Sequence, residues 1–218
     1  MSIVPEQLER HTLVWLTAAG WHAAIGAARS EHKTALQLWE SQDWPLVARR
    51  LDADASDDEV CLGLPLPPDD AGIKVRIALR AHMANVCRVA PALPLREAAA
   101  VCAGVAALQD DAGGLPLRVF GSVAMQALTG LRYVTARSDV DVLFAPSSRR
   151  QLEDGVALLA RHDERLALDG EIVFPGGAAV SWKEWRMAMA HPAKVLVKDL
   201  RSVRLADTAS LLATLKAA

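Results

Sequence analysis

Cysteine is scarce in this sequence and follows no paired or metal-binding pattern. The three cysteines, Cys61, Cys87 and Cys102, form no CxxC motif, and an odd number cannot pair off completely. This excludes a disulfide framework and a zinc site built on cysteine, and it fits a reducing compartment.

Long apolar runs and an excess of one charge are also missing. No stretch approaches the roughly 20 apolar residues that span a bilayer, and the first residues lack the basic start and apolar run of a signal peptide. We therefore expect a cytoplasmic protein without a membrane partner. The net charge of −2 argues against a general nucleic-acid-binding protein.

Several common catalytic motifs are absent as well. The chain has no Walker lysine loop and no Gly-x-Ser-x-Gly setting around a serine, so a P-loop enzyme and a serine hydrolase are unsupported. Its six histidines show no spacing typical of metal ligands.

What is present indicates two folded units. With 218 residues, 52% of them hydrophobic, the chain can form one large domain or two small ones. Residues 1–112 carry 10 Lys and Arg against 15 Asp and Glu, whereas residues 113–218 carry 14 against 11. The mildly basic second half suggests an anionic ligand or partner there. We expect an α+β protein, with a smaller β-rich domain at 1–90 and a larger domain at 91–218.

The smaller domain is expected to hold a helix and several strands. A helix over Ser30–Trp44, stopped by Pro45, would turn Leu36, Leu38 and Trp39 inward. The apolar run HTLVWL near the start fits a helix or a strand. Strands are expected at Leu46–Leu51, Glu59–Leu66 and Ile73–Ala81.

The larger domain shows alternating strand and helix patterns, typical of a mixed sheet flanked by helices. Strands are expected at Leu117–Phe120, Val140–Phe144 and Leu166–Phe174. Helices are expected at Leu95 to about Gln109, from Gly121 to Leu131, from Ser147 or Ser148 to Arg161, and from Asp207.

A Gly-Ser pair opens one of these helices. A strand ends at Phe120, and Gly121 and Ser122 make a tight turn into the helix. Glycine lets the backbone approach a ligand closely, and the free N–H groups at a helix start, with the serine hydroxyl, can hold a phosphate.

Two carboxylates follow on the next strand. Asp139 and Asp141 are two residues apart, so they point to one face while Val140 and Val142 point to the other. At about 5 Å and an effective dielectric near 20, two carboxylates repel by roughly 3 kcal/mol, which a cation would offset. Hard divalent ions such as Mg²⁺ take oxygen ligands, and phosphoryl transfer needs a phosphate cradle facing such acids.

A third acid is expected on a later strand. Asp169 and Glu171, in the run LALDGEIVF, are both candidates because they share a face. Asp169 is preferred, as it lies at the centre of the strand pattern, but Glu171 stays open. Lys194 and Lys198 share a face if AKVLVKDL is a strand, and Lys198 is our first choice for a cation near a phosphate.

These motifs together resemble the DNA polymerase β nucleotidyltransferase superfamily, in which Gly-Ser at a helix start precedes a DxD strand and a third acid. Over nearly its whole length the sequence is also similar to the phosphoribosyl-dephospho-CoA transferase (holo-acyl-carrier-protein synthase, MdcG) family of malonate decarboxylase. The residues that carry this resemblance are Gly121-Ser122, Gln126, Leu128-Thr129-Gly130-Leu131, Tyr133, Ser138 to Asp141, Leu168 to Val173, RHTLVWL and KVLVK. Met125 stands where that family suggests Trp.

The resemblance implies a nucleotidyltransferase fold for 91–218 and a reaction. It implies transfer of 2′-(5″-phosphoribosyl)-3′-dephospho-CoA from its triphosphate precursor, 2′-(5″-triphosphoribosyl)-3′-dephospho-CoA, to a serine of the malonate decarboxylase acyl carrier protein. Diphosphate leaves. Mg²⁺, with Mn²⁺ as the alternative, would be held by Asp139, Asp141 and Asp169 or Glu171, while Gly121 and Ser122 hold phosphates. The domain at 1–90 would then help to dock the substrate or the carrier protein.

Two other functions fit the same residues. One is a nucleotidyltransferase that uses ATP or CTP on a small molecule. The other is a non-catalytic binding module that keeps the fold. Trp182 and Trp185, three residues apart, could stack on an adenine, although core packing is favoured.

Overall fold

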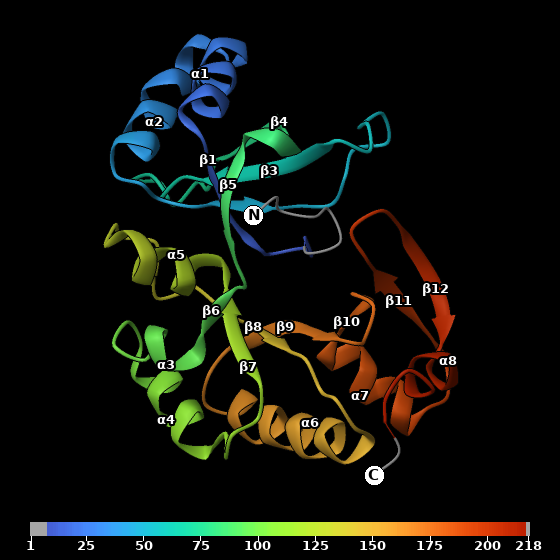
Figure 1. Ribbon diagram of the computed structural model, residues 1–218. Helices are drawn as coiled ribbons and strands as arrows, with labels where there is room; N and C mark the ends of the chain where they lie inside the picture. The colour runs from blue at the N-terminus through green and yellow to red at the C-terminus, as the bar shows by residue number, and fades with distance from the viewer. Residues whose placement is uncertain (1–7, 217–218) are drawn as a thin grey trace. The chain divides into compact units, whose positions relative to one another are not determined.

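The structure is a computed structural model that describes residues 8–216. Its internal contacts divide the chain into two compact units, Met1–Pro91 and Ala92–Ala218. Each unit has a β-sheet of its own, so the protein is a mixed α+β chain with two sheets (Figure 1). The docking role expected for the first unit stays a prediction.

The first unit is an antiparallel sheet with two helices. Its elements are β1 (Leu13–Leu16), α1 (Ala18–Ala27), α2 (Ser30–Ser41), β2 (Leu46–Ala48), β3 (Glu59–Pro65), β4 (Arg76–His82), the short 3₁₀ turn η2 (Met83–Asn85) and β5 (Val86–Ala90). The five strands pair in the order β4-β3-β2-β1-β5. The ambiguous run near the start is therefore a strand, β1.

The expected helix of this unit forms, but it is shorter than predicted, and one of the residues predicted to point inward points outward. Leu36 and Trp39 are buried as predicted, whereas Leu38 is 45% exposed. A residue two positions from Leu36 lies about 200° around a helix and therefore turns away from the core. The helix ends at Ser41 rather than Trp44.

The third expected strand of this unit starts late. Ile73 and Val75 are 60% and 42% exposed and precede β4. The carboxylate of Asp69 accepts hydrogen bonds from the backbone N–H groups of Ala71 and Ile73, at 3.0 and 2.8 Å. These residues thus belong to a turn, which local alternation of apolar residues could not indicate.

The second unit contains a mixed sheet. Its elements are β6 (Leu93–Pro94), α3 (Leu95–Ala98), α4 (Ala103–Asp111), β7 (Leu117–Phe120), α5 (Gly121–Thr129), β8 (Val140–Phe144), α6 (Arg149–Asp163), β9 (Leu168–Val173), β10 (Ala179–Ser181), α7 (Trp182–Ala190), β11 (Lys194–Lys198), β12 (Val203–Asp207) and α8 (Thr208–Leu212). The seven strands pair in the order β12-β11-β10-β9-β8-β7-β6. Strands β8 and β9 are parallel, joined through α6, and the other pairs are antiparallel.

One face of this sheet is packed against helices. Alternate strand residues form a core with α4, α6 and α7, and they include Val119, Val140, Val142, Phe144, Leu168, Ile172 and Val195. Trp182 and Trp185 belong to the same core, 0% and 1% exposed, so they pack rather than stack on a ligand. The residues between these positions point to the opposite face of the sheet.

Most expected elements of this unit are confirmed, and one helix is wrong. Strands β7 and β8 have the predicted bounds, whereas the single helix expected over Leu95 to Gln109 is two helices. Cys102 between them is extended, with φ −147° and ψ 123°. The break lets Val101 and Cys102 pack against the core, a tertiary gain that outweighs the helix preference of the alanine-rich run.

None of the helices in residues 8–216 is both long enough and apolar enough to cross a membrane.

Candidate functional site

The predicted acids and the Gly-Ser turn meet on three neighbouring strands. Phe120, the last residue of β7, pairs with Asp141 on β8, and Asp141 pairs in turn with Asp169 on β9. Residues that pair directly across a sheet point to the same face. Asp141 and Asp169 therefore share the face opposite the helix-packed core, next to the start of α5.

Gly121 brings the helix start against the carboxylate of Asp141. Its φ is +66°, a conformation that residues with a Cβ rarely adopt. A Cβ built on Gly121 would lie 2.9 Å from Cγ of Asp141 and would overlap its Oδ2. The carboxylate thus occupies the space that a side chain at this position would need.

The start of α5 also presents backbone donors. The helix begins at Gly121, and Phe120 at its N-cap position supplies no side-chain hydrogen bond to it. The first N–H groups of a helix have no partner inside the helix and favour an anion. Ser122 is half-buried within this first turn. The turn therefore places anion-binding groups beside Asp141.

A second glycine brings β9 close to β8. A Cβ on Gly170 would overlap the carbonyl oxygen of Val142 and lie 2.7 Å from its nitrogen. Gly170 follows Asp169 directly, and its N–H donates to Oδ1 of that side chain at 2.8 Å. The close approach holds the exposed Asp169 alongside Asp141.

Asp139 lies directly before β8, at the end of a loop that α5 itself restrains. Oε1 of Gln126 accepts hydrogen bonds from the backbone N–H groups of Tyr133 and Val134, at 3.0 and 2.8 Å. The Thr135 N–H donates to Oγ of Ser138 at 3.0 Å and closes the last turn before Asp139.

This loop gives a structural role to Gln126 and the Leu128-Thr129-Gly130-Leu131 run, which carry part of the family resemblance and had no structural role in the sequence analysis. The Thr129 hydroxyl donates to the carbonyl of Met125 and accepts from the Leu131 N–H, at 2.7 and 3.2 Å. Tyr133 is buried, and burial raises the pKa of its hydroxyl. The motif thus ties the chain between α5 and β8. The sequence did contain a signal for this role: Gln126 is a polar side chain inside an amphipathic helix that ends at a glycine.

Glu171 and Lys198 form a pair on the same face. Glu171 is buried, and its Oε1 lies 3.4 Å from Nζ of Lys198 on β11. The pair ties β9 to β11 across β10. It leaves Asp169, rather than Glu171, beside Asp141.

Two other cations near the site, Lys194 and Arg118, take no part in this pair. Lys194 starts β11 and pairs with Asp207, about 13 Å along the strand from Lys198. Arg118 on β7 donates from Nη1 to the carbonyl of Ala92 at 2.8 Å. Lys198 therefore contacts Glu171, whereas Arg118 is bonded to the backbone of Ala92.

The acids do not form a finished metal-binding cluster. Among residues 8–216, no three His, Cys, Asp or Glu side chains come together as a group that could hold a metal ion. The donor chemistry nevertheless suits Mg²⁺, because Asp139, Asp141 and Asp169 supply only hard carboxylate oxygens. A magnesium site here stays a prediction.

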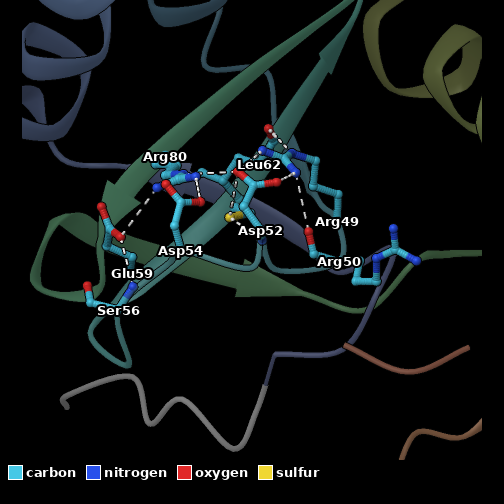
Figure 2. Close-up of polar contacts among 9 residues, drawn as sticks. Arg49, Arg50, Asp52, Asp54, Ser56, Glu59, Leu62 and Arg80 are labelled. Atoms are coloured by element: carbon cyan, nitrogen blue, oxygen red, sulfur yellow. Dashed lines mark hydrogen bonds and ion pairs between the residues drawn. The ribbon is translucent and has the colours of Figure 1, made fainter. Parts of the chain in front are cut away.

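A separate charged cluster lies in the first unit (Figure 2). Asp52 accepts two hydrogen bonds from Arg49, at 2.5 and 2.8 Å, and one from Nε of Arg80, at 2.9 Å. Arg80 also donates to Asp54 at 2.5 Å. The guanidinium of Arg49 is the main cause that holds the pKa of the Asp52 carboxyl well below its usual range. Each arginine of the cluster is neutralised by an acid, so the cluster fastens the loop between β2 and β3 to β4.

Comparisons with known proteins agree over most of the chain. Residues 81–209 match the family model of the phosphoribosyl-dephospho-CoA transferase MdcG C-terminal domain, and residues 9–92 match that of the MdcG N-terminal domain. A phosphoribosyl-dephospho-CoA transferase from Xanthomonas campestris pv. campestris (strain 8004) is 38% identical over 211 residues, 93% of this chain and 95% of its own length. One from Bradyrhizobium diazoefficiens is 39% identical over 209 residues, 91% of this chain and 89% of its own. No solved structure matches the chain.

Proposed function

Because the chain belongs to the phosphoribosyl-dephospho-CoA transferase family MdcG, we propose that it transfers 2′-(5″-phosphoribosyl)-3′-dephospho-CoA to a protein serine. The donor is 2′-(5″-triphosphoribosyl)-3′-dephospho-CoA, and the acceptor is the acyl carrier protein of malonate decarboxylase. The observation that carries the proposal is the contact between Gly121 and the Asp141 carboxylate, with Asp169 in register beside it. The expected cytoplasmic location stays a prediction.

The reaction is a substitution at the α-phosphorus of the triphosphate. The serine oxygen forms a bond to that phosphorus, and the bond to the bridging oxygen of the β-phosphate breaks, so diphosphate leaves. A strand, a helix with Gly-Ser at its start and an acid-bearing strand in sequence support a nucleotidyltransferase type of fold for this unit. In this chemistry catalysis is mostly positioning and charge stabilisation.

The residues of the site take distinct roles. The N–H groups of Gly121 and Ser122 hold the β- and γ-phosphates at the helix start. Asp139, Asp141 and Asp169 would hold Mg²⁺, or alternatively Mn²⁺, which when bound neutralises the leaving diphosphate and lowers the pKa of the serine hydroxyl. Asp169 also accepts the serine proton.

Lys198 completes the charge balance on this face. Its side chain is 38% exposed, and its ammonium lies 3.4 Å from the Glu171 carboxylate on this face. A cation fixed there attracts the anionic donor, and the buried Glu171 keeps the flexible lysine side chain in place.

The test is transfer with purified components. The protein is incubated with the triphosphate donor, Mg²⁺ and apo carrier protein, and diphosphate release and carrier mass are followed. We expect stoichiometric diphosphate and a carrier heavier by the transferred group, and Asp141→Asn should slow both at least about 100-fold. Asp154→Asn on the exposed side of α6 is the matched control and should act like the wild type.

Two results would contradict the proposal. Equal transfer from ATP or CTP to a small molecule would indicate the alternative nucleotidyltransferase. Tight binding of the triphosphate donor without diphosphate release, with intact carrier protein present, would indicate a binding module.

A further inference from the structure

A row of exposed apolar side chains lies on the last two strands of the larger sheet. Leu196 on β11 is 36% exposed, and Val203 and Leu205 on β12 are 42% and 63% exposed. Leu196 pairs with Leu205, so these side chains lie side by side. Their neighbours Val195, Val197 and Ala206 point the other way into the core.

Strand register places this row on the same face as the acids. Glu171 pairs with Ser181, and Ala179, two residues before Ser181 on β10, pairs with Lys198. Lys198 pairs in turn with Val203. Because pairing and a two-residue step both keep the face, the apolar row continues the face that carries Asp141 and Asp169. The Lys198 to Glu171 contact confirms this continuity.

Cations lie at both ends of the row. The segment from Lys194 to Asp207 contains four Lys and Arg but only two Asp. Lys194, opposite Asp207, and Lys198 share the face of the row, whereas Arg204 pairs with Val197 and points to the other face. One of these acids, Asp199, accepts hydrogen bonds from the N–H groups of Arg201 and Ser202, so its carboxylate closes the hairpin turn. An apolar strip bordered by cations complements an acidic partner with apolar side chains of its own.

The distance from the acids indicates how large that partner is. Strand β12 is three strands from β9, which is about 14 Å at the usual spacing of about 4.8 Å. A standard protein interface covers about 800 Å² per partner, a disc with a radius of about 16 Å. The row thus falls inside the footprint of a protein whose hydroxyl reaches Asp169, and outside the reach of a small acceptor.

We propose that the β11–β12 face, defined by Lys194, Leu196, Val203 and Leu205, is the docking surface for the acceptor protein. The partner is an acidic domain that presents apolar side chains next to its acceptor serine. This inference rests on the proposed function and adds the surface by which the acceptor is selected.

The test replaces one exposed leucine by a negative charge in one variant and by a positive charge in another. Leu205→Glu should raise the KM for apo carrier protein at least tenfold, because it removes apolar contact and repels an acidic partner. Leu205→Lys, which removes the same contact but attracts an acidic partner, should raise that KM less. Neither variant should change the KM for the triphosphate donor. Met187→Glu on α7 is the matched control, since Met187 is 67% exposed and lies outside the row.

Binding of the apo carrier protein, measured by calorimetry without the donor, gives a second readout. The affinity for the carrier should be lower in Leu205→Lys than in the wild type, and lowest in Leu205→Glu. Unchanged carrier KM and unchanged carrier affinity in Leu205→Glu, with an active wild type, would overturn the docking surface while the proposed function stands. An inactive wild type with intact carrier would instead overturn the proposed function. A wild-type dimer that Leu205→Glu splits, with carrier affinity unchanged, would assign the row to a second copy of the chain.

Discussion

Replacing Gly121 by alanine tests the central contact of the site. The new methyl group would lie 2.9 Å from Cγ of Asp141, whereas ordinary contact begins at 3.4 Å, and it would overlap Oδ2. The carboxylate or the turn must therefore move, by about 1 Å to restore normal carbon contact distances. Alanine must also adopt φ +66°.

The two effects have different sizes and different readouts. A left-handed conformation costs alanine about 1–2 kcal/mol. The overlap adds about 1–3 kcal/mol to the loss of stability, as overpacking does in other proteins. Displacement of a catalytic group by about 1 Å can lower the rate about 100-fold. We expect Gly121→Ala to lose about 2–5 kcal/mol of unfolding free energy and at least about 100-fold in kcat/KM.

A matched variant separates the backbone effect from the overlap. Gly114 has φ +87° and no heavy atom within 4 Å of its built Cβ, so Gly114→Ala carries the conformational cost alone. Urea unfolding should give it about 1–2 kcal/mol of destabilisation, and diphosphate release should stay near the wild-type rate.

A double-mutant cycle isolates the contact itself. In an Asp141→Ala background Oδ2 and Cγ are gone and only Cβ remains, 3.3 Å from the built Cβ, so adding Gly121→Ala should cost little more than Gly114→Ala does. The expected coupling free energy is about 1–3 kcal/mol. Additive stability losses, or a Gly121→Ala enzyme within threefold of the Gly114→Ala enzyme, would refute the geometry on which the site is built.

Three further predictions concern other parts of the chain. Gln126→Met removes the acceptor that holds the loop before the acids and should lower kcat/KM at least tenfold, whereas Gln126→Glu keeps an acceptor oxygen and should restore most of it; equal losses in both variants would contradict this role. Asp169→Asn should lower kcat at least about 100-fold and Glu171→Gln much less, measured by diphosphate release, and the reverse order would make Glu171 the third acid. Asp52→Asn should lose about 1 kcal/mol near neutral pH in urea unfolding. Because folding lowers the pKa of Asp52 below its ordinary 3.8, this stabilisation is complete above about pH 4 and fades as pH falls below it, so a pH-independent difference would contradict the ion pair as its source.

Sequence alone predicted the parts of the fold that depend on local pattern. The strand Val140–Phe144 has the predicted bounds because a short apolar run stands between polar segments. The helix at Gly121 starts where a glycine turn allows it. By contrast, the break at Cys102 and the outward Leu38 depend on what the tertiary core requires, which no local pattern records.

The site divides in the same way. The two-residue spacing of Asp139 and Asp141 identified the face they share. The choice between Asp169 and Glu171 needed the register of β9 against β8. In that register Gly170 lies close to Val142, a residue far away in the sequence. The hydrogen bonds of Gln126 to the loop were also out of reach, because the side chain bonds to backbone seven and eight residues away.

Helix α5 has one more consequence for how accurately the site is built. The same nine residues begin at the anion-binding turn and carry Gln126, which restrains the approach to Asp139. A thermal shift of this helix moves the turn and the restrained loop in the same direction, so their separation changes less than either position does. Positional errors in the two halves are therefore correlated and partly cancel, and a short helix can keep ångström tolerances without being rigidly anchored.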